Sequence, residues 1–191
     1  MSSIKIASEL HARPLAGRVL AGRGIRSTDE VQLNSKQLPS PATLADFDTA
    51  VKLLTEAITQ KKKILIVGDY DADGATSTAL AMHVLQSIGV DASYLVPNRF
   101  EYGYGLSAEI VAVALQSAPD LILTVDNGVA SNEGVEKAIQ AGVTVVVTDH
   151  HLPPEELPDA HAIVNPNRSD CSFPAKNICG VGVIFLSLIH I

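Results

Sequence analysis

The sequence predicts an α/β protein whose parallel sheet is covered by helices on both faces. From residue 63 onward, short and continuously apolar segments alternate with segments of helical periodicity. Strands that are apolar throughout are typical of parallel sheets buried on both faces and joined by right-handed helical crossovers. Hydrophobic residues make up 47% of the 191 residues and charged residues 18%. This composition is that of a chain that builds a core.

The first part of the chain has a helical and turn-rich pattern. Residues 1–35 contain turn signals and the cap-like segment Ser27-Thr28-Asp29-Glu30, which predicts short helices. Residues 37–43 contain two prolines and are interpreted as a linker. Residues 44–60 carry apolar side chains at every third or fourth position, the spacing of an amphipathic helix. We therefore divide the chain into a helical N-terminal segment with a linker, residues 1–43, and an α/β domain, residues 44–191.

Within the α/β domain, short apolar runs define the strands and the stretches between them define the helices. Strands are expected at residues 64–67, 92–96, 121–125, 143–147 and 162–164. Helices are expected at residues 75–87, 108–116 and 133–141. An apolar helix is also expected to start after Gly182 and, without a partner domain, to expose its hydrophobic face.

Composition disfavours several classes of protein. The longest apolar run, residues 181–188, is too short to cross a bilayer, and no secretory signal follows Met1. We therefore expect a cytoplasmic protein with no membrane partner. Cys171 and Cys179 are too few for a disulfide framework or a four-cysteine zinc site. The net charge of −7 does not exclude a nucleic acid, because bound divalent cations would let the carboxylates hold phosphate.

Acidic and imidazole side chains gather directly after three of the predicted strands. They are Asp69, Asp71 and Asp73 after the first, Asp126 after the third, and Asp149, His150 and His151 after the fourth. The carboxyl ends of parallel strands meet at one edge of a sheet, so these groups are expected to converge there. A single Asp at such a position is usually a turn or cap residue, but three such segments in one sheet favour a ligand site.

The expected ligand is a divalent cation. Carboxylates in such a cluster repel one another unless a cation holds them. Oxygen donors mixed with imidazole suit Mn²⁺ or Mg²⁺, whereas Zn²⁺ is less suited without a thiolate. The number of donors favours two ions, an arrangement that activates water in phosphodiester hydrolysis.

The three segments together resemble the DHH phosphoesterase superfamily. The resemblance rests on Asp69-x-Asp71-x-Asp73-Gly74, Val125-Asp126-Asn127-Gly128 and Asp149-His150-His151. Residues 67–77, 96–100 and 148–153 are similar, more narrowly, to the bacterial members that are exonucleases specific for single-stranded DNA. The resemblance runs from about Leu20 to about Val183.

The resemblance implies roles for individual residues. Asp69, Asp71, Asp73, Asp126 and His150 would be metal ligands, with Asp126 bridging two Mn²⁺ or Mg²⁺ ions. Asp126, His150 and His151 would form the catalytic centre, with His151 beside the scissile phosphate or bound to a metal. Asp149 would orient an imidazole from behind the ligands.

Other residues of the same segments are candidates for substrate contact. Gly74 opens a helix whose N-terminal amides can hold phosphate oxygens. Arg99 is a candidate phosphate clamp, and a surface salt bridge is its alternative. Phe100, Tyr102 and Tyr104 can either stack on bases or form a packing plug.

The activity implied by the resemblance is that of a single-stranded-DNA-specific exonuclease. It would act 5′→3′, release 5′-mononucleotides and serve DNA repair and recombination, with single-stranded DNA, a helicase and a single-strand-binding protein as partners. The family's fourth motif, with a further metal-binding Asp, its DHHA1 domain and its OB-type domain do not occur in the 191 residues. We therefore expect an N-terminal fragment, and we expect residues 185–191 to depart from the family's sequence.

Two alternatives stay open at this point. The chain can be an inactive fragment that binds a metal or DNA without turnover. It can also be a phosphoesterase of the same superfamily that acts on pyrophosphate, an oligoribonucleotide or a cyclic dinucleotide. A haloacid-dehalogenase-like phosphatase is disfavoured, because such an enzyme has no use for Asp149-His150-His151.

Overall fold

A computed structural model describes residues 14–31, 38–98 and 102–191, and it divides the chain into two compact units, Met1–Leu38 and Pro39–Ile191. The described part of the first unit contains helix α2 (Pro14–Gly22) and the 3-10 helix η1 (Thr28–Val31). Glu30 Oε1 accepts hydrogen bonds from the backbone N–H groups of Arg26 (2.9 Å) and Ser27 (2.8 Å). The cap-like segment of the sequence thus does start a helix, although a short one.

The second unit begins with two helical elements that precede the sheet. The 3-10 helix η3 (Pro41–Thr43) lies within the residues expected to be a linker, and helix α3 (Phe47–Thr59) follows it. Of the apolar stripe that predicts this helix, Leu44, Phe47 and Leu54 are buried, and Val51 and Ile58 are partly buried. The second unit therefore includes residues 39–43 as well as the expected α/β domain.

Five parallel strands form the sheet at the centre of the second unit. They are β1 (Ile64–Gly68), β2 (Ala92–Leu95), β3 (Leu121–Val125), β4 (Thr144–Thr148) and β5 (Ala162–Val164). Their order is β2-β1-β3-β4-β5, and every neighbouring pair is parallel. All residues of β1 and β3 are buried, as their continuous apolar sequence predicts. The predicted parallel α/β fold is confirmed.

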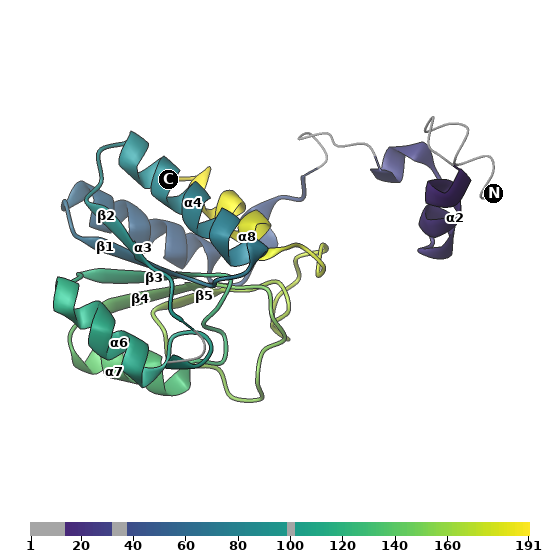
Figure 1. Ribbon diagram of the computed structural model, residues 1–191. Helices are drawn as coiled ribbons and strands as arrows, with labels where there is room; N and C mark the ends of the chain where they lie inside the picture. The colour runs from purple at the N-terminus through teal and green to yellow at the C-terminus, as the bar shows by residue number, and fades with distance from the viewer. Residues whose placement is uncertain (1–13, 32–37, 99–101) are drawn as a thin grey trace. The chain divides into compact units, whose positions relative to one another are not determined.

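Helices cover both faces of this sheet (Figure 1). They are α4 (Ala72–Ser87), α6 (Ala108–Ala114) with the 3-10 helix η4 (Leu115–Ser117), α7 (Asn132–Gln140) and α8 (Gly180–Leu188). Helices α3, α4 and α8 share one hydrophobic cluster with alternate residues of the strands, including Ile66 and Leu123. Helices α6 and α7 share the other cluster with the intervening strand residues, including Val67 and Ile122. Neighbouring strand residues therefore serve opposite layers of the core.

Helix α8 buries more of its apolar surface than the sequence predicts. Val183, Ile184, Leu186 and Leu188 are buried, and Phe185 is 38% exposed. The expectation of an exposed hydrophobic face is therefore wrong for most of this helix, because α8 packs against α4 within the same hydrophobic cluster.

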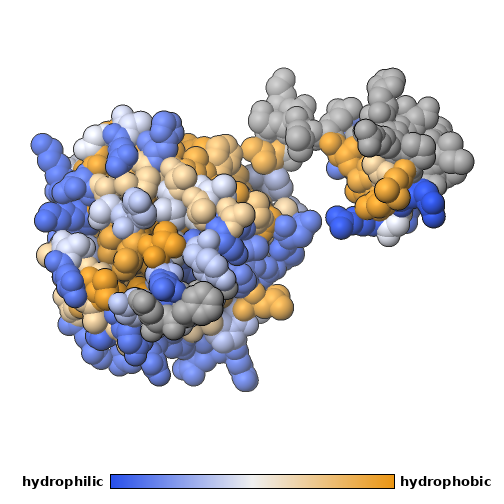
Figure 2. All heavy atoms as spheres, in the orientation of Figure 1, coloured by the Kyte–Doolittle hydropathy of each residue, from blue (hydrophilic) through white to orange (hydrophobic). Residues whose placement is uncertain are grey.

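The surface in Figure 2 mixes hydrophobic patches with hydrophilic side chains. Within residues 14–31, 38–98 and 102–191, no helix is both long enough and apolar enough to span a membrane.

The strand order places a reversal between β1 and β3. The chain leaves β1 into α4 on one face of the sheet, and it leaves β3 toward α7 on the other face. The two loops therefore diverge at the carboxyl ends of these strands, the place where an open α/β sheet has its crevice. In open α/β sheets, ligands bind at such a switch point.

Candidate metal centre

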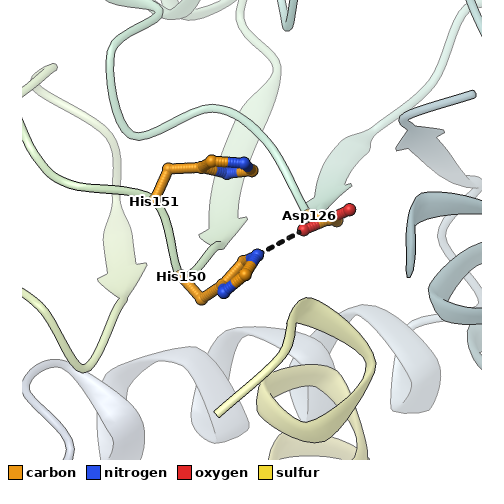
Figure 3. Close-up of side chains that lie close together, drawn as sticks. All are labelled: Asp126, His150 and His151. Atoms are coloured by element: carbon orange, nitrogen blue, oxygen red, sulfur yellow. Dashed lines mark ion pairs between the residues drawn. The ribbon is translucent and has the colours of Figure 1, made fainter. Parts of the chain in front are cut away.

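The crevice brings together acidic and imidazole groups from three loops. Asp126 follows β3, while His150 and His151 lie in the loop after β4, and Figure 3 shows these side chains facing one another. Their donor atoms lie within 4.8 Å of one another, and those of Asp69, Asp71 and Asp126 form a second group of the same size. Asp126 belongs to both groups, so one carboxylate lies between two sets of potential ligands.

Asp126 occupies an unfavourable position for a carboxylate without a cation. Asp126 is 1% exposed, and its backbone φ of 62° lies in the left-handed region. Neither oxygen has a hydrogen-bond partner among the described residues, although His150 Nε2 lies 3.1 Å from Oδ1. Burial, together with the carboxylates of Asp73 and Asp71, raises the pKa of Asp126 to about 7. Unpaired buried oxygens of this kind fit a bound cation.

The loop after β1 presents Asp69 and Asp71 to the crevice. Asp71 is the N-cap of α4, and its Oδ1 accepts a hydrogen bond from Gly74 N–H at 2.9 Å. Asp69 is 5% exposed, and its Oδ1 accepts a hydrogen bond from Tyr70 N–H at 2.7 Å. A Cβ at position 74 would lie 2.4 Å from the carbonyl oxygen of Asp69, so a glycine is needed for this close approach. The N–H of Gly74, expected to face phosphate, is used by the cap.

Asp73 has a different set of contacts from Asp69 and Asp71. Its Oδ2 accepts a hydrogen bond from Gly180 N–H at 2.7 Å, and its Oδ1 accepts one from Val181 N–H at 2.8 Å. It is in neither group of donor atoms, although His150 Nε2 lies 3.5 Å from its Oδ2. Asp73 thus satisfies the first amides of α8 and ties that helix to the crevice.

Asp149 organises the loop that carries the two histidines. Its Oδ2 accepts a hydrogen bond from Val129 N–H at 2.9 Å, and its Oδ1 accepts bonds from the N–H groups of His150 (2.7 Å) and His151 (3.1 Å). His151 Nδ1 lies 2.7 Å from the same Oδ1, and this hydrogen bond raises the pKa of His151. A carboxylate so placed keeps the proton on Nδ1 and leaves Nε2 toward the crevice.

Three asparagines that were not predicted as site residues support the centre. Asn127 Nδ2 donates to the carbonyl oxygens of Val67 (3.0 Å) and Val125 (2.9 Å), which joins the ends of β1 and β3. Asn165 Nδ2 donates to His151 O at 3.0 Å, and Asn167 Nδ2 donates to His150 O. Asn165 directly follows the end of β5 and Asn127 lies two residues after the end of β3, which is the signal that could have found them.

The structure describes only some of the remaining candidate residues. Arg99 and Phe100 lie outside the described residues. Tyr104 lies at the crevice, with its hydroxyl 3.2 Å from His151 Nδ1. The backbone N–H of Tyr102 donates to Asn98 O at 3.0 Å, and its carbonyl oxygen accepts a hydrogen bond from Ser107 Oγ. Cys171 and Cys179 belong to neither group of metal-holding residues.

A parallel sheet with carboxylate and imidazole groups at its switch point defines an α/β protein whose side chains could hold a divalent cation there. The chain belongs to the DHH family, whose N-terminal-domain model matches residues 63–189. This match extends beyond Val183. The expectation that the family resemblance ends there, and that the following residues depart from it, is therefore wrong up to residue 189.

Two curated relatives of the chain are named "Single-stranded-DNA-specific exonuclease RecJ". The chain is 48% identical over 189 residues to the protein from Haemophilus influenzae, covering 98% of this chain and 33% of that protein. It is 50% identical over 173 residues to the Escherichia coli protein, covering 90% of this chain and 30% of that protein. The chain thus spans about a third of the length of these relatives.

The chain is also similar in fold to solved structures of RecJ proteins. One is described as exonuclease RecJ bound to manganese, with 39% identity, a TM-score of 0.71, and coverage of 77% of this chain and 37% of that chain. Another is RecJ in complex with Mn²⁺ from Thermus thermophilus, with 32% identity, a TM-score of 0.72, and coverage of 98% and 26%.

Proposed function

We propose that the chain forms the metal-binding core of an exonuclease that hydrolyses single-stranded DNA from its 5′ end and releases 5′-mononucleotides. The observation that carries this proposal is Asp126, a buried carboxylate without hydrogen-bond donors that belongs to two groups of potential ligands. The names of the relatives support the substrate class. Because the chain spans a third of their length, the proposed activity is that of the whole protein.

The proposed cofactors are two Mn²⁺ or Mg²⁺ ions. Asp126, His150 and His151 are the donors for one ion, and Asp69, Asp71 and Asp126 are the donors for the other. Such ions supply an activated water and stabilise the charge that develops on the phosphate. The manganese-bound structures described above support this choice of metal.

The residues around the donors would orient the reacting groups. Asp149 keeps the proton on Nδ1 of His151, so that Nε2 faces the crevice. From there the neutral imidazole would bind an ion through Nε2. The imidazolium, which the Asp149 hydrogen bond favours, would instead pass its Nε2 proton to the oxygen that leaves phosphorus and return to the neutral form. Asp73 would act from the edge of the site, because both of its oxygens accept hydrogen bonds from α8.

The cellular setting is part of the same proposal. We infer a cytoplasmic role in DNA repair and recombination, with Arg99 as a phosphate clamp. A helicase that unwinds duplex DNA and a single-strand-binding protein would be its partners. The helicase follows from the substrate, because duplex DNA must be opened before a single strand can be degraded.

The test is digestion of single-stranded and duplex DNA by the whole protein that carries this chain, with Mn²⁺ or Mg²⁺. Labelled 5′ and 3′ ends report the direction of degradation. Asp126→Ala should abolish release of mononucleotides, whereas Asp159→Ala, which changes an exposed Asp, should retain it.

Three results would contradict the proposal. They are equal rates on single-stranded and duplex DNA, activity that survives Asp126→Ala, and faster hydrolysis of pyrophosphate or a cyclic dinucleotide than of DNA. Metal binding by the whole protein without any turnover would favour an inert binding protein instead.

A further inference from the structure

A tyrosine flanked by glycines reaches the metal centre from the loop between β2 and α6. Gly103 and Gly105 have φ values of 78° and 72°, a conformation that L side chains rarely adopt. The two glycines allow the backbone to turn sharply on either side of Tyr104. The segment Gly103-Tyr104-Gly105 therefore bends on both sides of its one aromatic side chain.

The hydroxyl of Tyr104 lies among groups of the candidate centre. It is 3.2 Å from Nδ1 and 3.4 Å from Nε2 of His151, and 3.5 Å from the carbonyl oxygen of Asp126. The Tyr104 and His151 rings meet edge to face, with centroids 5.8 Å apart and planes at 81°. The hydroxyl donates to the Asp126 carbonyl oxygen, so it contacts the imidazole without using the Nε2 lone pair that faces the crevice.

The loop that carries Tyr104 is attached to both helices of its layer. Leu106 N–H donates to Ser131 Oγ at 3.1 Å, directly before α7. A Cβ at Gly134, in the first turn of α7, would lie 1.8 Å from the carbonyl oxygen of Leu106, so the loop and helix are in close contact. Ser107 caps α6 by accepting a hydrogen bond from Ile110 N–H at 3.3 Å. Tyr104 is thus presented from an anchored segment.

Asp149 alone does not define the orientation of the His151 ring. One hydrogen bond at Nδ1 selects the tautomer, but it leaves the ring able to swing about that contact. His151 has a 44% exposed side chain, so burial restrains it little. The neighbouring His150 ring, with its centroid 4.7 Å away, belongs to the same loop as His151. Tyr104 contacts the ring from a different loop and supplies a further restraint.

We propose that Tyr104 is a positioning residue that holds the His151 imidazole in place against Asp149, an assignment that rests on the proposed function of the site. The hydroxyl limits the swing of the ring, and Nε2 therefore keeps one direction toward the crevice. Tyr104 takes no part in bond breaking.

The first experiment measures the imidazole itself in the 191-residue chain, with and without Mg²⁺. Tyr104→Phe removes only the hydroxyl, and Tyr94→Phe is the matched control, because Tyr94 is 62% exposed on strand β2. Ring signals of His151, assigned in NMR spectra with His151→Gln, should shift and broaden in Tyr104→Phe and not in Tyr94→Phe. Equal signals in the two variants would overturn the proposal.

The second experiment measures turnover by the whole protein. Tyr104→Phe should lower kcat on single-stranded DNA about tenfold, the scale expected when a reacting group loses its orientation, while KM changes less than about twofold. Tyr94→Phe should leave both constants unchanged. A rise in KM at constant kcat, with unchanged His151 signals, would mean that Tyr104 binds DNA instead, and it would contradict a positioning role.

A variant at Gly105 keeps the Tyr104 hydroxyl but changes the backbone that carries it. Gly105→Ala strains a φ of 72° and places a Cβ 3.0 Å from Ser131 Oγ, whereas Gly89→Ala strains a similar φ of 77° with no atom within 4 Å. Gly105→Ala should change the His151 signals as Tyr104→Phe does, and Gly89→Ala should not. Altered His151 signals in a protein that degrades no DNA would support the positioning role and reject only the nuclease.

Discussion

At the residue scale, the candidate centre depends on a carboxylate that the fold buries and leaves without hydrogen-bond donors. The pKa of Asp126 is raised from 3.8 to about 7, chiefly by burial and by the nearby Asp73 and Asp71. A raised pKa in the folded state means that the neutral carboxyl is better tolerated than the charged one. Stability from this group is therefore complete at low pH and is lost as the pH rises through about 7.

This dependence predicts the behaviour of Asp126→Asn. With a chelator present, the free energy of unfolding of the unmodified chain should fall between about pH 4 and pH 8, and the fall should be smaller in the variant. Mn²⁺ at pH 8 should restore stability to the unmodified chain and much less to Asp126→Asn, because binding to the folded state stabilises it. Urea unfolding at several pH values measures both effects. The same pH slope in both proteins would contradict the burial argument.

Asn127 allows a second prediction at this scale. Asn127→Ala removes the hydrogen bonds to Val67 O and Val125 O and leaves buried carbonyl groups at the ends of β1 and β3 without these donors. The expected cost is about 1–3 kcal/mol of unfolding free energy, together with weaker Mn²⁺ binding in calorimetric titration.

Asn132→Ala is the control for this prediction. Asn132 is also an asparagine that donates to a carbonyl, that of Glu156, but the bond is exposed and 3.2 Å long. Its loss should cost less than about 0.5 kcal/mol. Equal losses in the two variants would show that Asn127 does not hold the strand ends together.

The sequence predicts which side chains could be metal ligands, but it does not predict the hydrogen bonds that hold the neighbouring residues in place. Asp69, Asp71, Asp126, His150 and His151 could be predicted, because each follows an apolar strand and strand ends share one edge. The bonds of Asp73 to α8 could not, since they join residues 107 and 108 positions apart in the chain. The contact of Tyr104 with His151 likewise depends on how two distant loops meet.

At the scale of elements, the order and kinds of strands and helices follow from the sequence, and the exact ends follow from capping. Helix α4 begins at Ala72, before the predicted residue 75, because Asp71 caps it through Gly74 N–H. The predicted helix 108–116 is α6 followed by η4, since the chain tightens to a 3-10 turn before Ala118 adopts a left-handed φ of 48°. Periodicity identifies an element, whereas side-chain hydrogen bonds set its limits.

The contact between α7 and the loop before α6 yields a third prediction. Gly134→Ala would place a Cβ 1.8 Å from Leu106 O, so helix and loop must separate. We expect a loss of about 1–3 kcal/mol, as for overpacked cores, measured by urea unfolding. Gly22→Ala, at the end of α2 with no atom within 4 Å, should change stability little. A stability of Gly134→Ala equal to that of Gly22→Ala would contradict this packing.

At the scale of the whole molecule, all described donors and the residues that support them lie in the unit Pro39–Ile191. A chain that begins at Pro39 should therefore bind Mn²⁺ with the same stoichiometry and with an affinity within about twofold of that of the 191-residue chain. Isothermal titration of both chains measures this. A lost ion in the shorter chain would show that residues before Pro39 contribute to the centre.

The fold class of the whole molecule is the feature that sequence predicts best, because continuously apolar strands such as β1 and β3 have few other ways to be buried. The strand order is different. The placement of β1 between β2 and β3 results from crossovers to opposite faces, and no local pattern in the sequence records it.

The hydrogen bonds that Asn127 makes to Val67 O and Val125 O also affect the chemical stability of its side chain. Asn127 precedes Gly128, and an asparagine followed by glycine can lose its side-chain amide when the next backbone nitrogen attacks it. In the folded protein the amide is 1% exposed and donates to two carbonyl groups, so it is not free to adopt the geometry of that attack. In an unfolded chain it is free, and the acid that forms would add a negative charge next to Asp126. The rate at which Asn127 loses its amide should therefore depend on the fraction of time that the chain spends unfolded.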